Sequence, residues 1–179
     1  MTLRKIARMG HPVLWAQARP VDLPLSAALQ TLADDMIETM RDAPGVGLAA
    51  PQVHESLRLI VVQPERGPDA QPLVLVNPVL EPVGDTIEIG LEGCLSMPDL
   101  QGLVPRFHAV RYRGFDRTGQ PIDALAEGFF ARVLQHEVDH LDGILYPMRM
   151  RDPRDLAYTR EARHLIERMD RLAAGDPEP

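Results

Sequence analysis

The chain has 179 residues, of which 45% are apolar and 25% are charged, a composition that predicts one globular domain and excludes a disordered chain. The formal net charge of −7 argues against DNA as a partner, because nucleic-acid-binding proteins are usually basic. The single cysteine, Cys94, excludes an internal disulfide, and no apolar run approaches the roughly 18 residues of a membrane span, so we expect a cytoplasmic protein without a membrane partner.

The first element that the sequence predicts is a helix over residues 25–41, because leucine and methionine recur there at helical spacing. The basic segment before it contains a glycine and a proline that interrupt the apolar core of any signal peptide, which leaves a transit peptide as the alternative. Pro44–Gly45 ends the helix, and two apolar runs at 57–63 and 72–80 then predict strands.

A hairpin and a buried helix are predicted next. Residues 104–116 and 120–125 have the pattern of two strands, with a turn at Thr118–Gly119. Residues 128–141 are mostly apolar at helical spacing, and Asp142–Gly143 ends this helix. The hairpin therefore leads directly into a helix that we expect to be buried.

The overall order of elements predicts the fold class. A final helix is expected over residues 153–173, with four apolar residues on one side: Leu156, Leu165, Met169 and Leu172. Helices and strands are segregated along the chain, without alternation of single strands and helices. We therefore expect an α+β fold in a single domain, residues 1–179, with mostly antiparallel sheets around the central 128–141 helix and a helix near each end.

Two histidines in the central helix predict a metal site. His136 and His140 are four residues apart, so both imidazoles lie on one helix face and can meet one metal ion. Glu137 is rotated by about 100° from His136, which places it beside the ion, where it can transfer protons rather than bind. The alternative is chance histidines on a surface helix, but the flanking residues are apolar, and burial of unpaired polar groups is costly.

Catalytic metal sites usually have three protein ligands and one open position, so a third ligand is needed. One metalloprotease pattern has a histidine six residues after the second, but Tyr146 occupies that position here. Another pattern uses a glutamate from a later helix, for which Glu161 is the candidate. The third candidate is Cys94, and its alternative role is that of a small buried apolar residue. The tight EGCLS context favours Cys94 as the ligand.

Three short motifs occur in a fixed order: GVGLAAPQ at residues 45–52, EGCLS at 92–96 and QHEVDH at 135–140. In order and spacing they resemble the three motifs of the peptide deformylases. The stretches GHPVL and HLDGILYPMRM extend the resemblance over roughly residues 4–150. The resemblance implies that the substrate is the N-formyl group of a newly made bacterial polypeptide.

The resemblance also implies roles for individual residues. The metal site would be formed by three side chains: Cys94, His136 and His140. Glu137 would be the general acid and base, and the amide of Gln52 and the backbone N–H of Leu95 would donate to the oxyanion. The implied metal is Fe²⁺ in the cell, replaceable by Ni²⁺, Co²⁺ or Zn²⁺, whereas a thiolate and two imidazoles alone would equally accept zinc.

The chemistry of amide hydrolysis agrees with these roles. The formyl oxygen becomes negative in the tetrahedral intermediate, and Gln52 offers a neutral N–H donor that titration cannot remove. The small residues before it, including Val46 and Gly47, allow the backbone to approach the substrate closely. Phe129 and Val133 lie on the histidine face of the central helix, and Val46 should face them. We therefore expect these three residues to contact the methionine side chain; the alternative is that Phe129 and Val133 are plain core.

Supporting residues carry over from the resemblance as well. An ion pair between Glu92 and Arg106 is implied to support the cysteine loop, and its alternative is two ordinary surface charges. Gln101 occupies a position where some members have an arginine thought to hold the substrate backbone, and a glutamine lacks the charge-assisted bond. The C-terminal helix of the family can dock on the ribosome near the exit tunnel. From Arg149 onward this chain has seven arginines against seven acids, so its end is not basic.

We therefore predict a peptide deformylase that hydrolyses N-formyl-methionyl peptides to formate and a free amine. One alternative is a zinc endopeptidase with Glu161 as the third metal ligand. Another is a non-catalytic peptide-binding protein of the same fold. Formate release separates the first from the other two.

Overall fold

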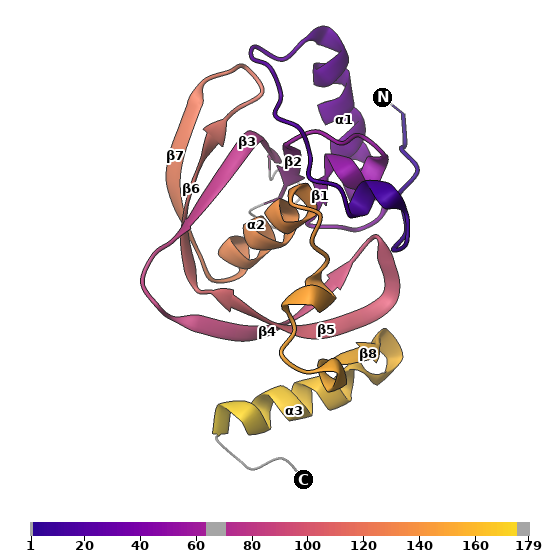
Figure 1. Ribbon diagram of the computed structural model, residues 1–179, viewed down its shortest axis with the longest axis vertical. Helices are drawn as coiled ribbons and strands as arrows, with labels where there is room; N and C mark the ends of the chain where they lie inside the picture. The colour runs from indigo at the N-terminus through magenta and orange to yellow at the C-terminus, as the bar shows by residue number, and fades with distance from the viewer. Residues whose placement is uncertain (1, 64–70, 175–179) are drawn as a thin grey trace.

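Helix α2 (Gly128–Leu141) lies at the centre of the molecule, with two antiparallel sheets around it (Figure 1). The computed structural model describes residues 2–63 and 71–174. The predicted α+β fold with a central helix and antiparallel sheets is confirmed. The remaining residues of the predicted single domain, 1, 64–70 and 175–179, lie outside the described residues.

Each sheet is built from antiparallel neighbours. The larger has the strand order β1-β2-β3-β6-β7 and the smaller β4-β5-β8. The strands of the larger sheet are β1 (Gly47–Ala49), β2 (Leu59–Val62), β3 (Leu73–Pro82), β6 (Ala109–Phe115) and β7 (Pro121–Glu127). Those of the smaller are β4 (Ile87–Cys94), β5 (Met97–Phe107) and β8 (Leu156–Tyr158).

Two further α-helices flank this framework, α1 (Ala27–Asp42) near the start and α3 (Ala162–Ala174) near the end. Short 3₁₀ helices connect the described elements: η1 (Pro12–Leu14), η2 (Ala50–Val53), η3 (Tyr146–Arg149), η4 (Pro153–Asp155) and η5 (Thr159–Glu161). No helix in the described part of the chain has both the length and the apolar character needed to cross a membrane.

Strand β2 shows how the core positions α2. All four of its residues are buried, and successive side chains point to opposite faces of the sheet. Leu59 and Val61 pack in the cluster that contains α1, whereas Ile60 and Val62 pack in the cluster that contains α2. Each buried aliphatic side chain contributes roughly 1.5–3 kcal/mol. The sheet is therefore fixed between the two helices, and α2 is held firmly against it.

Several predicted elements agree closely with the structure. The central helix has the predicted bounds, and Gly143, with φ of 73°, follows its end. Helix α1 begins two residues later than predicted, because Ser26 Oγ accepts a hydrogen bond from the Leu29 N–H and caps it. The strands at 57–63 and 72–80 and the turn at Thr118–Gly119 are also found.

The predicted single strand over residues 104–116 is wrong. It is two strands, β5 and β6, which belong to different sheets and separate at His108. The side chain of Gln135 on α2 bonds both the N–H and the C=O of Phe107, at 3.0 and 2.9 Å. These two bonds satisfy the backbone polar groups of Phe107, where the chain passes from one sheet to the other. The strand-like sequence pattern can therefore run through this point although the strand itself does not.

The predicted start of the last helix at residue 153 is also wrong, because α3 begins at Ala162. Residues 156–158 instead form β8, which pairs with residues 100–102 of β5. Leu156 therefore does not share a helix face with Leu165, which is buried in α3. Backbone pairing with a distant strand overrides the local helical pattern here. Figure 1 shows α3 on the outside of the smaller sheet.

Candidate metal centre and active site

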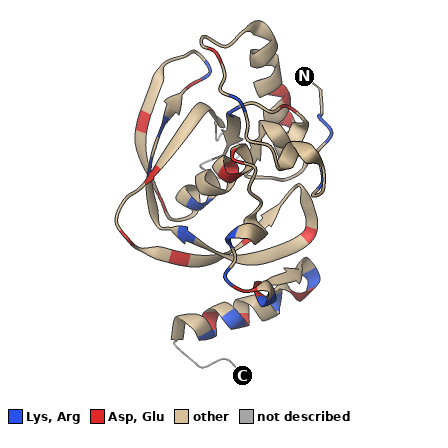
Figure 2. Cartoon of the chain, viewed as in Figure 1, with Lys and Arg blue, Asp and Glu red and all other residues tan. Residues whose placement is uncertain are grey.

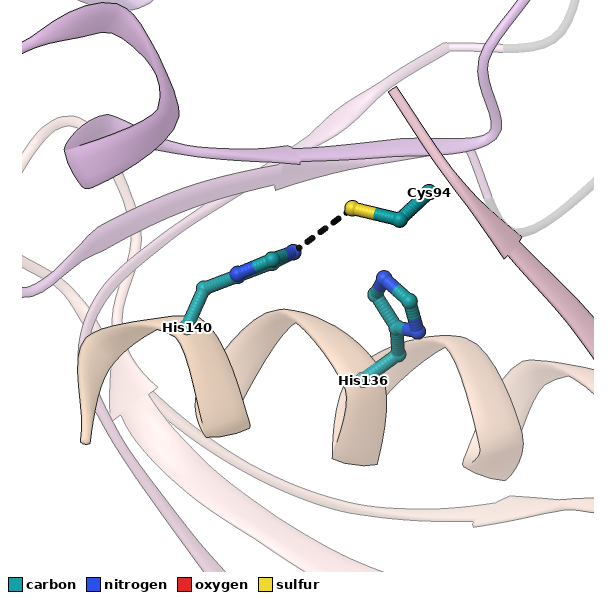
Figure 3. Close-up of side chains that lie close together, drawn as sticks. All are labelled: Cys94, His136 and His140. Carbon is teal, nitrogen blue, oxygen red and sulfur yellow. Dashed lines mark hydrogen bonds between the residues drawn. The ribbon is translucent and has the colours of Figure 1, made fainter. Parts of the chain in front are cut away.

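Three donor side chains come together at the end of β4 and on one face of α2 (Figure 3). Cys94 is the last residue of β4, and His136 and His140 extend from α2. One donor atom of each lies within 4.8 Å of the other two, and Cys94 Sγ lies 3.3 Å from His140 Nε2. Within residues 2–63 and 71–174, no other group of three His, Cys, Asp or Glu side chains meets this geometry.

The chemistry of this donor set fits a divalent transition metal. Burial opposes ionisation of Cys94, but the charges and hydrogen bonds of His140 and His136 lower the pKa of its thiol well below the usual range. A thiolate and two imidazoles are ligands for zinc and neighbouring transition metals, and three protein ligands leave a fourth position open. The residues present therefore fit the metal ion that the sequence predicts.

The carboxylate of Glu92 is hydrogen-bonded to the imidazole ring of His136. Its Oε2 lies 2.8 Å from His136 Nδ1, and Arg106 donates to both carboxylate oxygens at 2.9 and 3.0 Å. Burial opposes ionisation of Glu92, but the hydrogen bonds from His136 and Arg106 lower its pKa to about 2. The ion pair between Glu92 and Arg106 is present and buried, not a pair of surface charges. A carboxylate on one imidazole nitrogen orients the ring and leaves the other nitrogen for a metal.

Three residues that the sequence analysis did not single out extend this network. Arg132 Nη1 donates to Glu92 Oε1 at 2.9 Å. Asp139 accepts hydrogen bonds from Arg149 at 2.7 and 3.1 Å, and it also accepts one from the arginine that pairs with Glu92. Asp139 belongs to the QHEVDH motif, and Arg132 lies one helical turn before His136. Their helical spacing from His136 could therefore have identified Arg132 and Asp139.

Glu137 points from α2 toward β1. A Cβ added to Gly47 would lie 2.3 Å from Glu137 Oε1, so any larger residue at that position of β1 would displace the Glu137 carboxyl group. Glu137 Oε2 is buried and has no hydrogen-bond partner among the described side chains and backbone groups. Burial raises the pKa of Glu137 to about 7. This carboxyl group is placed to exchange a proton with a small molecule beside the donor cluster.

Gln52 and Leu95 reach the site from two different segments. Gln52 Nε2 lies 3.5 Å from Cys94 Sγ and 3.2 Å from Ser96 Oγ, while its Oε1 accepts the Ala49 N–H at 2.8 Å. The carboxamide is therefore fixed with its NH₂ group toward the cysteine. Leu95 follows Cys94 in the turn between β4 and β5. Ser96, which positions the NH₂ group, was not among the predicted site residues.

A pocket of about 800 Å³ opens beside the donor cluster. Its lining includes all four residues predicted to contact substrate: Val46, Gly47, Phe129 and Val133. Val133 is 6% exposed, whereas Phe129 is 53% exposed and therefore is not plain core. Gln101 also lines the pocket. The structure brings these residues together, and their contacts with substrate remain predictions.

The other candidate for the third ligand, Glu161, lies away from the donor cluster. Glu161 is exposed, lies 3.7 Å from His164 and is not part of the donor cluster. Tyr146 is buried and its ring stacks on that of His136, with centroids 6.1 Å apart. The zinc endopeptidase alternative, which required Glu161, therefore has no support in the structure.

Comparisons with known proteins agree with this geometry. The family described as polypeptide deformylase matches residues 3–155. Peptide deformylase 1 of Bordetella pertussis is 50% identical over 163 residues, which cover 88% of this chain and 93% of that protein. Peptide deformylase 2 of Pseudomonas putida is 49% identical over 165 residues, again 88% and 93%.

Solved structures show the same likeness. A peptide deformylase from Legionella pneumophila superposes with a TM-score of 0.80 at 38% identity, covering 98% of this chain and all of that one. A class I type b peptide deformylase from Acinetobacter baumannii with bound Met-Ala-Ser gives 0.78 at 39% identity, covering 83% and 99%. Sequence, fold and donor geometry all lead to one assignment: the chain belongs to the polypeptide deformylase family.

Proposed function

We propose that Cys94, His136 and His140 bind one divalent metal ion, next to which the chain hydrolyses N-formyl-methionyl peptides. As a member of its family, the chain is a hydrolase that removes the N-formyl group from newly made polypeptides. The observation that supports the residue assignment is the donor cluster, with its atoms within 4.8 Å of one another beside the buried Glu137. The products are formate and a free amine.

A divalent metal, when bound, supplies Lewis acidity that polarises a carbonyl and lowers the pKa of water. Glu137 accepts the proton of the attacking water at its carboxylate and later gives a proton to the leaving amine. The Gln52 NH₂ group and the Leu95 N–H donate to the formyl oxygen as it becomes negative. Because Gln52 is already fixed by Ala49 and Ser96, little reorganisation is needed during the reaction.

Formate release from formyl-Met-Ala by protein purified without air, combined with metal analysis, tests this function. Turnover with close to one metal per chain is the expected result. Bound metal without turnover would support the non-catalytic peptide-binding alternative. Cleavage of an internal peptide bond without formate would support an endopeptidase.

The methionine side chain is proposed to bind at Val46, Phe129 and Val133, and the variant Val133→Phe tests this. Burial of a methionine gains roughly 1.5–3 kcal/mol, so the wild type should prefer formyl-Met over formyl-Ala peptides by about ten- to a hundredfold in kcat/KM. The added ring of Val133→Phe fills the pocket and should erase most of this preference. The measurement is the ratio of the two kcat/KM values.

Val83→Phe, at an exposed position after β3, is the matched control and should keep the wild-type ratio. Both variants should keep their bound metal, because neither residue belongs to the donor cluster. An unchanged ratio in folded, metal-loaded Val133→Phe would place the side-chain pocket elsewhere.

The bound ion is proposed to be Fe²⁺, and sensitivity to air tests that assignment. Oxidation of the iron or of the Cys94 thiolate ends ligation, so aeration should inactivate the enzyme as isolated. Replacement of the ion by Ni²⁺ should protect activity. The measurement is the activity half-life with and without air. Equal half-lives for the two samples would count against iron and favour Zn²⁺, Ni²⁺ or Co²⁺.

The cellular setting is part of the proposal too. A single cysteine suits the reducing cytoplasm, where newly made polypeptides emerge from the ribosome. Helix α3 is proposed to contact the ribosome near the exit tunnel. Figure 2 shows positively and negatively charged residues interspersed along this helix, so its contact would depend less on charge than that of a basic tail. Residues 1–179 are proposed to form one catalytic domain.

A further inference from the structure

A short N-terminal stretch connects the two segments that carry the proposed oxyanion donors. The Ala7 N–H donates to the Gln52 C=O at 2.7 Å, and two residues later the Met9 N–H donates to the Ser96 C=O at 2.9 Å. In Figure 1 this stretch, in indigo, passes beside the turn that joins β4 and β5. The backbone on either side of the donor groups is therefore tied to one continuous piece of chain.

Between these two contacts, Arg8 reaches the same turn with its side chain. Arg8 Nη1 donates a hydrogen bond to the Leu95 C=O. The peptide group that carries this C=O also carries the Ser96 N–H, which donates to Cys94 Sγ at 3.4 Å. In a planar trans peptide the C=O and N–H point in opposite directions. Holding the C=O outward with Arg8 therefore directs the N–H inward, onto the cysteine.

A flip of this peptide group would break both contacts at once. It would remove the N–H from Cys94 and turn the Leu95 carbonyl oxygen, an acceptor, toward the thiolate. It would also change the ψ angle of Leu95, the residue that follows the metal ligand and whose N–H, in the preceding peptide group, is proposed to donate to the formyl oxygen. A guanidinium suits the task of preventing this, because it stays charged and forms a charge-assisted hydrogen bond with the carbonyl.

We propose that Arg8 is a positioning residue, which fixes the Leu95–Ser96 peptide group so that the Ser96 N–H stays on Cys94 Sγ and the turn beside the proposed Leu95 donor keeps one conformation. This inference rests on the proposed function, because it takes Cys94 as a metal ligand and Leu95 as an oxyanion donor. Arg8 also lines the pocket, so direct binding of substrate is the competing role.

Steady-state kinetics on formyl-Met-Ala separate the two roles. In Arg8→Ala, kcat should fall by about tenfold, less than for complete removal of a preorganised donor, because the peptide group is loosened and not removed. KM should stay within about twofold, and bound metal should be unchanged. Arg8→Lys keeps a charged donor and should recover most of kcat. Lys5→Ala removes an exposed cation from the same N-terminal segment and should behave as wild type.

A second measurement does not depend on turnover. In the Zn²⁺-loaded protein, hydrogen exchange of the Ser96 amide, followed by NMR, should be about tenfold faster in Arg8→Ala than in wild type or Lys5→Ala. Thermal unfolding of each variant checks that the fold is kept. Arg8→Met, which keeps the aliphatic part of the side chain but has no donor, replaces Arg8→Ala if that variant does not fold.

The outcomes are distinct. A lower kcat with faster Ser96 exchange supports the positioning role. An unchanged kcat overturns it, and so does a raised KM at constant kcat, which assigns Arg8 to substrate binding. Unchanged Ser96 exchange also overturns it. If the wild type released no formate, the proposed function would fail, while the exchange measurement would still decide whether Arg8 holds the peptide group.

Discussion

Glu137→Gln is expected to lower kcat for formate release by about 10²–10⁴-fold, the usual effect of losing a general acid and base. Glutamine has the shape of glutamate but cannot accept the proton of the attacking water. The position is closely packed, since a Cβ on Gly47 would lie 2.3 Å from Glu137 Oε1, so a substitution of equal size is required. Measurement of kcat and of bound metal on the same sample separates proton transfer from metal binding.

The bound metal should be unchanged in Glu137→Gln, because Glu137 is not part of the donor cluster. Glu167→Gln, at an exposed position of α3, makes the same chemical change far from the site and should keep full activity. A Glu137→Gln variant within a few-fold of wild type would remove Glu137 from the mechanism. Loss of metal in this variant would instead give the carboxylate a role in the metal site.

Cys94→Ser is expected to lose most of its bound metal and with it the activity. A serine hydroxyl stays protonated near neutral pH and is a poor substitute for a thiolate, so only the two imidazoles would remain as strong ligands. The partners that stabilise the Cys94 thiolate, His136 and His140, would also lose their anionic neighbour. Metal per chain after gel filtration, together with thermal unfolding, measures the effect.

Glu161→Ala is the control for this experiment. Its carboxylate pairs with His164 in the exposed C-terminal segment, so the variant should keep its full complement of metal and its activity. The opposite pattern, with metal kept in Cys94→Ser and lost in Glu161→Ala, would falsify the assignment of Cys94 and restore the endopeptidase alternative.

Features that depend on neighbouring residues could be predicted from the amino-acid sequence. The bounds of α2 follow from apolar residues at helical spacing and a following Asp142–Gly143. The same spacing put His136 and His140 on one face and Glu137 beside them. The resemblance of three motifs then supplied what spacing could not, namely that a cysteine 46 residues before His140 is its neighbour.

Features that depend on distant partners could not be predicted in this way, because they arise from contacts between segments far apart in the chain. Residues 156–158 became a strand because β5 offered a backbone edge, and residues 104–116 divided between two sheets because Gln135 supports the crossing. The burial of the Glu92 network and the contact of Arg8 with the Leu95 carbonyl also join segments far apart in sequence. A local pattern encodes only the period of its own element. Which elements meet, and so which buried charges find partners, is set by packing of the whole chain.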